Sequence, residues 1–437
     1  MSRNRRLWNL STILLATAVL TLLVVPGVKG ASNFKTLHSL TGGTYAGVTL
    51  DSAGNLYGTT VGGGAYGQGT VFELTPNSNG RWTEHVLHDF AGGKDGAAPY
   101  AGPIFDAAGN LYGTTRYGGA SGSGTVFQLT PDSNSHWSER VLHQFTGGKD
   151  GGEPWSGVIL DSSGNLYGTT SGGGNSSDCA YSSCGVVFEL TPSANGGWQE
   201  KVLHSFTGKD GGSPLASLVF DGRGNPYGTT EWDSVYLGGT VFELNHGSNG
   251  EWTEHVLHRF SRGSDGAHPV AGLILGAASH LYGTTEFGGE LGACGGGGCG
   301  VVFELTHTSN GRWTEHVLYK FTGGTDGAAP LASLTFDPAG NLYSTASEGG
   351  AYSQGTVFEL TRDRGGKWTQ HLLHEFTLGT GAGAPNSGLI LDSARELYGT
   401  TLVGGSYGKG LSSNSHINSG PRERHVGPAS VVEVPDN

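Results

Sequence analysis

The sequence has few charged residues, and few of these are basic. Only 14% of its 437 residues are charged, and 24 Lys and Arg stand against 37 Asp and Glu, for a formal charge of −13. Binding to nucleic acid or to an anionic membrane surface needs clustered Lys and Arg. We therefore expect no nucleic-acid partner. The hydrophobic content of 35% is too high for a disordered chain.

Long apolar runs are equally scarce, and the one clear example is N-terminal. Residues Ile13–Val25 follow three arginines, Arg3, Arg5 and Arg6, and end at a Pro-Gly pair. This order is typical of a signal peptide. We predict that residues 1–30 are removed, that residues 31–437 form a single domain, and that the protein is exported to the periplasm, cell surface or medium without membrane insertion. A retained N-terminal anchor is the open alternative.

Glycine, in contrast, is abundant, with 80 residues, but it lacks the Gly-x-y period of collagen. A string of the type Gly-Asn-Leu-Tyr-Gly-Thr-Thr recurs instead, about every 55–61 residues. Its tyrosines are Tyr57, Tyr112, Tyr167, Tyr227, Tyr282, Tyr343 and Tyr398. A Thr-Val-Phe-Glu-Leu string follows each copy, and a Trp-Thr-Glu-His-Val-Leu-His string follows that one. The chain is therefore one unit repeated seven times.

Each unit is predicted to contain four short strands. The first is of the type Gly157–Asp161, and the next three are the recurring strings, all rich in β-branched and aromatic residues. An Asp-x-x-Gly turn joins the first two strands. The chain starts with a lone copy of the fourth strand, from Phe34, and finishes after the third strand of unit seven, Ser430–Val434. We predict an all-β, seven-bladed β-propeller whose N-terminal strand completes the last blade and closes the ring.

The repeat resembles that of the bacterial tandem-repeat family called GloVer, whose members carry varied C-terminal anchors. The resemblance rests on Asp-x-x-Gly-Asn-Leu-Tyr-Gly-Thr-Thr followed by Gly-Thr-Val-Phe-Glu-Leu-Thr-Pro, in order, over about residues 34–405. It implies an exported or surface-held repeat protein. It carries over no catalytic residue and no cofactor, and no anchor is visible before Asn437.

Residues that every copy shares are interpreted as structural, because each blade must pack on its neighbours. The strand-four histidines are expected to be hydrogen-bonded within their own blades. They are His38, His88, His143, His204, His258 and His374, with Tyr319 in the remaining copy. The Asp-Gly-x-x-Pro aspartates are interpreted as turn residues, with a Ca²⁺-binding ring near the channel mouth as the alternative. They are Asp95, Asp150, Asp210, Asp265 and Asp326.

Four cysteines form two Cys-x4-Cys pairs, Cys179/Cys184 and Cys294/Cys299. Both pairs lie in the connection between the second and third strands, in two copies where that connection is lengthened. In an exported protein such pairs indicate two local disulfides. A zinc site made by both pairs is the alternative.

Residues that differ between copies are the candidates for function. They lie on the face that carries the longest loops, and loops on a rigid scaffold often bind ligands. We expect these side chains to gather at one mouth of the channel: Tyr100, Trp155, Arg116, Glu231, Trp232 and Glu286. Aromatic rings beside charged groups suit a sugar ligand.

The sequence thus favours a monomeric, non-catalytic binding or scaffold propeller without a cofactor, whose partner is a polysaccharide or an envelope protein. An extracellular carbohydrate-active enzyme is the alternative, in which Glu231 and Glu286 serve as acid and base. The polar loop from Ser406 to Pro428 is interpreted as disordered, with a functional lid as the second possibility.

Overall fold

The computed structural model describes residues 34–134, 136–175, 179, 184–308, 311–377, 382–404 and 430–435. The described residues belong to one compact unit. The predicted signal peptide and the loop from 406 to 428 lie outside them. No helix of the described residues is long and apolar enough to cross a membrane.

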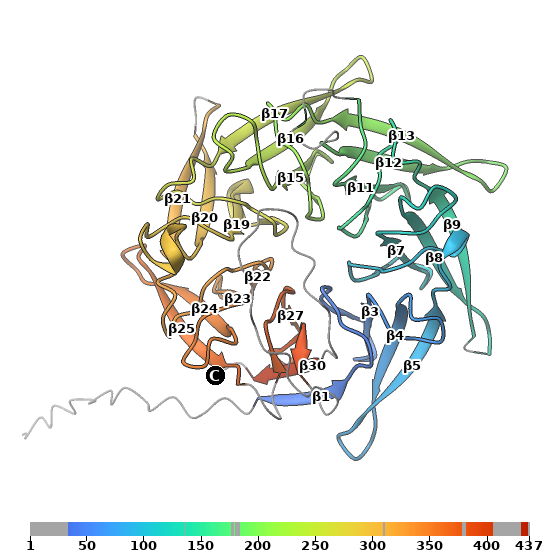
Figure 1. The fold of residues 1–437 in the computed structure, drawn as a ribbon, viewed down its shortest axis with the longest axis horizontal. Coiled ribbons are helices and arrows are strands. Elements are labelled where there is room, and N and C mark those ends of the chain that lie inside the picture. The colour runs from blue at the N-terminus through green and yellow to red at the C-terminus, as the bar shows by residue number, and fades with distance from the viewer. Residues whose placement is uncertain are drawn as a thin grey trace, which may run out of the picture. The chain divides into compact units, whose positions relative to one another are not determined.

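Seven four-stranded antiparallel sheets form the ring in Figure 1, which confirms the predicted propeller. The strands nearest the axis are β2 (Thr49–Leu50), β6 (Ile104–Phe105), β10 (Ile159–Leu160), β14 (Val219–Phe220), β18 (Ile274–Leu275), β22 (Thr335–Phe336) and β27 (Ile390–Leu391). The second strands are β3 (Leu56–Thr60), β7 (Leu111–Thr115), β11 (Leu166–Thr170), β15 (Pro226–Thr230), β19 (Leu281–Thr285), β23 (Leu342–Ala346) and β28 (Glu396–Thr401).

The outer half of each blade holds the longer strands. The third strands are β4 (Thr70–Pro76), β8 (Thr125–Pro131), β12 (Val186–Pro192), β16 (Thr240–His246), β20 (Val301–His307), β24 (Thr356–Arg362) and β30 (Ser430–Pro435). The outermost are β5 (Trp82–Asp89), β9 (Trp137–Gln144), β13 (Trp198–Ser205), β17 (Trp252–Arg259), β21 (Trp313–Lys320), β25 (Trp368–Glu375) and β1 (Lys35–Ser39). Within the described residues, the connections contain a small ladder, β26 (Ala382–Gly383) with β29 (Val403–Gly404), and three 3-10 turns, Gly93–Asp95, Ala277–Ser279 and Cys294–Gly296.

The ring closes through the N-terminal strand. β1 pairs antiparallel with β30, so that Lys35 lies opposite Glu433 and Ser39 opposite Ser430. The last blade therefore combines both ends of the described chain in the order β1-β30-β28-β27. Leu37 and Leu40 from the N-terminal segment join a buried cluster with Val431. The predicted closure is confirmed.

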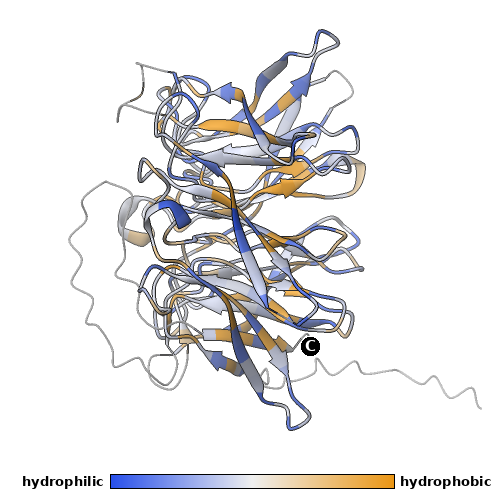
Figure 2. Cartoon of the chain, turned by 90° about the vertical axis from the view of Figure 1, so that its right-hand side faces the viewer, coloured by the Kyte–Doolittle hydropathy of each residue, from blue (hydrophilic) through white to orange (hydrophobic). Residues whose placement is uncertain are grey.

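Apolar side chains pack between neighbouring blades. Phe90 of blade one contacts Phe127 of blade two, with ring centroids 5.2 Å apart. The tryptophan that begins each outer strand except β1 also reaches across, as Trp137 does to Tyr57 at 6.5 Å. Figure 2 shows the apolar stretches along the strands and polar ones in many of the loops. Burial between blades explains why the same positions recur in each copy.

A ring of hydroxyl–carbonyl hydrogen bonds surrounds the axis. The first threonine of each Thr-Thr pair, or its equivalent, donates to a carbonyl in the segment before the next blade's inner strand. The bonds are Thr59–Ala101 (3.1 Å), Thr114–Ser156 (2.7 Å), Thr169–Ala216 (3.1 Å), Thr229–Ala271 (3.1 Å), Thr284–Ala332 (3.1 Å), Thr345–Ser387 (3.2 Å) and Thr400–Ala46 (2.6 Å). Each inner connection is thus fixed by the preceding blade, and the last bond closes the ring.

Two local features differ from the prediction. The innermost strand of each blade has two residues rather than five, because the carbonyls just before it bond to the adjacent blade instead of a strand partner. In addition, all seven blades contain a β-bulge that places one extra residue in the outermost strand, as Leu87 in β5 and Leu37 in β1. A bulge leaves one residue unpaired and bends the strand.

Candidate functional site

Three aromatic rings form a continuous wall across blades one to three, in the segments just before the innermost strands. Tyr45 and Tyr100 stack with centroids 4.9 Å apart and an interplanar angle of 11°. Trp155 meets Tyr100 edge to face at 4.6 Å. All three side chains are half-buried. The structure thus brings together two of the aromatic residues singled out in the sequence and adds a third.

Tyr45 was missed because its segment lacks the proline that marks the other copies. The string Tyr45-Ala-Gly nevertheless aligns with Tyr100-Ala-Gly. In the structure, the Ala46 carbonyl accepts a hydrogen bond from the Thr400 hydroxyl, as the Ala101 carbonyl does from Thr59. This shared bond identifies Tyr45 as the equivalent of Tyr100 although no proline precedes it.

Arg116 lies beneath this wall and ties it to blade three. Its guanidinium carbon is 4.2 Å from the centre of the Trp155 ring and 5.2 Å from that of Tyr100. Its Nη2 is 3.1 Å from Glu153 Oε2, and Nη1 donates to Tyr100 Oη at 3.4 Å. The arginine side chain is only 6% exposed. A guanidinium desolvated against ring faces and paired with a carboxylate holds those rings in place.

The backbone that presents Glu153 is in a left-handed conformation. Its φ is 53°, and the residue before the proline shares this geometry in five further copies, namely Ala98, Ser213, His268, Ala329 and Ala384. Such angles are uncommon for residues other than glycine. Backbone bonds fix the conformation, since the N–H of Glu153 donates to Ser123 and its carbonyl accepts from Ser171. Each of these blades therefore presents one side chain from the same constrained position.

Glu231 and Glu286 occupy the position of Arg116 in blades four and five. Burial raises the pKa of Glu231 above the usual value for a glutamate, although a bond from Ser213 opposes this. The imidazole of His268, from the next connection, lies 4.0 Å from the Glu231 carboxylate. Burial lowers the pKa of His268 to about 4. Glu231 is thus a carboxyl group whose surroundings favour the neutral acid.

Trp232 does not belong to the aromatic wall. Its ring lies over Gly212, where an added Cβ would be 2.5 Å from the ring, and it packs against the buried cluster that contains Phe206 and Cys184. Consecutive residues of an extended segment point to opposite sides. Glu231 faces the connection of the next blade, and the partly buried Trp232 lies on the other side, over Gly212. The grouping expected from the sequence is therefore wrong for this residue.

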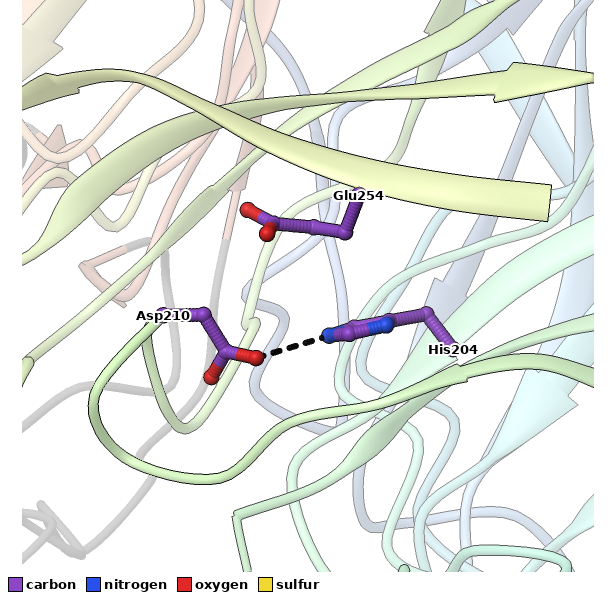
Figure 3. Close-up of side chains that lie close together, drawn as sticks. All are labelled: His204, Asp210 and Glu254. Carbon is purple, nitrogen blue, oxygen red and sulfur yellow. Dashed lines mark hydrogen bonds and ion pairs between the residues drawn. The ribbon is translucent and has the colours of Figure 1, made fainter.

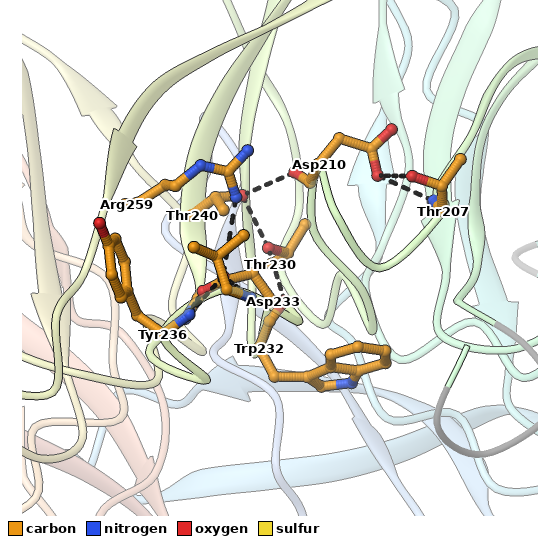
Figure 4. A network of polar contacts seen from close by, with 10 residues as sticks. Thr207, Asp210, Thr230, Trp232, Asp233, Tyr236, Thr240 and Arg259 are labelled. Atoms are coloured by element: carbon orange, nitrogen blue, oxygen red, sulfur yellow. Dashed lines mark hydrogen bonds and ion pairs between the residues drawn. The ribbon is translucent and has the colours of Figure 1, made fainter. Parts of the chain in front are cut away.

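A buried aspartate organises the loop that follows Trp232 (Figure 4). Asp233 is fully buried and accepts the N–H groups of Val235 (2.7 Å), Tyr236 (2.9 Å) and Gly239 (3.1 Å). Its carboxylate also lies 3.7 Å from Arg259 Nη1. The loop thus fixed exposes Val235, Tyr236 and Leu237, each by more than half.

The aspartates of the Asp-Gly-x-x-Pro segments do not form a ring at the channel mouth. Each carboxylate accepts a hydrogen bond from a backbone N–H just after its own outermost strand, as Asp210 does from Thr207 at 2.8 Å. Each also lies beside the His or Tyr of that strand. The turn interpretation is confirmed and the Ca²⁺ ring is contradicted, because the carboxylates face the outer strands rather than the axis.

The strand-four histidines are structural in their contacts, but they are not confined to one blade. His38 on β1 of blade seven pairs with Glu84 on β5 of blade one, with 2.9 Å between Nε2 and Oε2. The expectation of bonds only within a blade is therefore wrong for this residue. The imidazole lies at the blade border, where a side chain from the next outer strand comes within reach.

Both predicted disulfides are present, Cys179–Cys184 and Cys294–Cys299. All four cysteines are thus consumed, and none is free. The alternative of a zinc site shared by the two pairs is contradicted. Disulfides persist in oxidising compartments, so this chemistry fits an exported protein.

The ring of four-stranded blades, the short internal repeat and the two loop disulfides define a disulfide-containing, seven-bladed repeat propeller. Within this class, the chain belongs to the family of the Gloeobacter/Verrucomicrobia repeat, whose model matches residues 26–196 and 177–413. The resemblance to GloVer proteins is confirmed. No curated protein matches the chain.

The chain is also similar, at low sequence identity, to several solved structures. A putative oxidoreductase (glucose dehydrogenase) from Thermus thermophilus is 15% identical, with a TM-score of 0.41, and the match covers 92% of this chain and all of that one. A puromycin-hydrolyzing peptidase from Mycobacterium tuberculosis is 10% identical, with a TM-score of 0.47, over 84% of this chain and 53% of that one. These similarities are weak and assign no activity to this chain.

Proposed function

We propose that this protein is an exported binding propeller that takes a carbohydrate at the aromatic wall of Tyr45, Tyr100 and Trp155. The observation that supports this is the contact of three half-buried rings over the Arg116–Glu153 pair. Ring faces pack against the C–H faces of a sugar, while the ion pair and the tyrosine hydroxyls meet its hydroxyl groups. The wall is preorganised, so little conformational entropy is lost on binding.

Export is the second part of this proposal and rests on separate observations. We infer that residues 1–30 act as a cleaved signal peptide and that residues 31–437 form the mature domain. The three-part pattern of basic residues, apolar run and small residues supports this, as do the two disulfides. Mass spectrometry of the protein recovered from the envelope or medium tests it. A mature N-terminus near Ala31 is the expected result, and an intact Met1 in the exported fraction contradicts it.

The test of binding is a polysaccharide and glycan array probed with residues 31–437, followed by titration of each hit. The variant Trp155→Leu is suited to this fold, because Leu215 and Leu331 occupy the same position in other blades. We expect it to weaken binding by roughly tenfold or more, which corresponds to about 1.4 kcal/mol. The matched control is Leu215→Val, since Val270 occupies that position in blade five, and it is expected to leave affinity unchanged.

Equal affinity of Trp155→Leu and the unaltered protein rules out the wall as the binding site. An array without hits contradicts a carbohydrate ligand and favours a protein partner, for which the exposed Val235–Leu237 segment is the first surface to alter.

A second candidate, a carbohydrate-active enzyme, is favoured by one observation. Burial raises the pKa of Glu231, as expected of a general acid, and Glu286 is its equivalent in the next blade. Product analysis on each array hit tests it. Cleavage that disappears in Glu231→Gln/Glu286→Gln establishes the enzyme. Binding without cleavage, unchanged by the double substitution, excludes it.

A further inference from the structure

An imidazole and two carboxylates converge at the border between blades three and four (Figure 3). His204 projects from β13, Asp210 from the following connection, and Glu254 from β17 of the next blade. His204 Nε2 is 3.1 Å from Asp210 Oδ2. One potential ligand atom from each residue lies within 4.8 Å of those from the other two. These are three donor groups that bind divalent metals in proteins.

The Glu254 carboxylate is not accounted for by hydrogen bonds. Its Oε1 is buried and has no hydrogen-bond partner among the described residues. A buried polar atom without a hydrogen-bond partner lowers the stability of the fold. A cation bound to this oxygen would remove that cost at the border between the two blades.

The same set of residue types recurs at three more borders, in His88/Asp95/Glu139, His143/Asp150/Glu200 and His258/Asp265/Glu315. In the last two, the His–Asp distances are 3.6 and 3.7 Å, and His Nε2 and one glutamate oxygen are buried without a hydrogen-bond partner in the described part of the chain. The unsatisfied carboxylate of Glu254 is therefore a repeated feature and not an accident of one rotamer.

At the border between blades five and six, the equivalent three residues are connected by hydrogen bonds alone. Tyr319 replaces the histidine and donates to Asp326 at 3.0 Å. Gln370 replaces the glutamate, and its amide donates to the Asp326 carbonyl at 3.4 Å. The imidazole and the second carboxylate are thus replaced together, and hydrogen bonds take their place. Where histidine and glutamate occur without this aspartate, as His38 and Glu84 do, they pair directly with each other.

We propose that His204, Asp210 and Glu254 bind a divalent transition-metal cation, with Zn²⁺ as the probe, that links blade three to blade four. Ligand atoms lie about 2.0–2.2 Å from zinc, which places neighbouring ligands roughly 3.3–3.6 Å apart. The His204–Asp210 pair already has nearly this spacing, and a side-chain rotation of Glu254 completes it. The two carboxylate charges neutralise the ion. Because the ligands come from two blades, the metal stabilises the folded ring.

The experiment uses the full chain after treatment with a chelator. Zn²⁺ is titrated by calorimetry, Co²⁺ is titrated by visible absorption, and thermal unfolding is recorded with and without metal. We expect bound metal, a tetrahedral cobalt spectrum and a raised Tm. Glu254→Gln is tolerated by the fold because Gln370 holds the same position in blade six. This variant and His204→Gln are each expected to lose one bound equivalent. His136→Gln, an exposed histidine with 82% of its side chain accessible, is the matched control.

A gain of binding provides the reverse test. Tyr319→His/Gln370→Glu rebuilds the donor set around Asp326, and we expect one additional equivalent of Zn²⁺ in the folded variant. Absence of metal binding in the unaltered chain overturns the proposal. A metal count that is the same in the unaltered chain, His204→Gln and Glu254→Gln also overturns it. Failure of the double variant to gain an equivalent contradicts the ligand assignment.

Discussion

At the scale of the residue, the borders between blades differ in the side chain that the next blade places beside the strand-four histidine. Next to His374, the following outer strand presents an aromatic ring, because Phe34 stands at the position that Glu84 holds in blade one. The two rings stack with centroids 3.9 Å apart and an interplanar angle of 9°. The imidazole is therefore held neutral among apolar groups.

This contact predicts a pH dependence of stability. Burial lowers the pKa of His374 to about 4, although Glu375 opposes the shift. The unfolded chain, with an ordinary histidine pKa near 6.5, binds more protons than the folded one between these values. Stability is thus lost as the pH falls from about 6.5 to about 4. Tm measured across this range is expected to fall less steeply in His374→Tyr, a residue that blade five uses at the same position.

His136→Gln serves as the control, because that side chain is exposed and is expected to leave the slope of Tm against pH unchanged. If the slopes of the unaltered chain and His374→Tyr coincide, the stacked imidazole contributes nothing to the acid sensitivity.

At the scale of the element, a glycine in each of five second strands lets a phenylalanine ring of the third strand pack against the backbone. An added Cβ at Gly168 would lie 2.6 Å from the Phe188 ring of the neighbouring strand, and at Gly58 2.5 Å from Phe72. The ring of the third strand thus lies directly over the backbone of the second. Close approach of this kind is one physical reason for the recurrence of Gly in the Tyr-Gly-Thr-Thr string.

The loop disulfides also act at this scale. The Cys294–Cys299 bridge packs against Gly323 in the connection that follows β21, where an added Cβ would meet Cys294 Sγ at 2.5 Å. Replacing both cysteines by serine is expected to lower the free energy of unfolding by about 2 kcal/mol, because a loop of a few residues is no longer closed in the unfolded chain. Denaturant titration measures this.

The same pair of substitutions at Cys179 and Cys184 is the matched comparison, since the separation is again five residues. A loss well above about 2 kcal/mol in either case would show that the bridge stabilises the folded loop and not only restricts the unfolded chain.

At the scale of the whole molecule, stability depends on closure of the ring. β1 provides the outermost strand of the seventh blade, and the Thr400–Ala46 bond links the seventh blade to the first. Residues 31–40 are therefore expected to be essential. Their deletion exposes the edge of β30 and removes Leu37 and Leu40 from a buried cluster.

We predict that a chain starting at residue 41 has a lower Tm than one starting at residue 31 and forms oligomers through the open edge. Thermal unfolding and light scattering compare the two. The chain that starts at residue 31 should match the full-length protein, since it retains β1. Equal stability and monomer content of both truncated chains would show that closure does not depend on this strand.

The sequence by itself determined the number of blades, the order of the strands, the closure of the ring and the disulfide pairing, because these depend on local patterns that each copy repeats. It also placed Tyr100, Trp155 and Arg116 at one site, since equivalent positions of adjacent blades must be neighbours. The tertiary structure alone decided that Trp232 packs over Gly212 away from the aromatic wall, that the five aspartates turn toward the outer strands, and that Glu84 and Glu254 lie beside a histidine of the preceding blade. Those outcomes depend on which group the neighbouring blade presents across the border, and a pattern within one repeat does not contain that information.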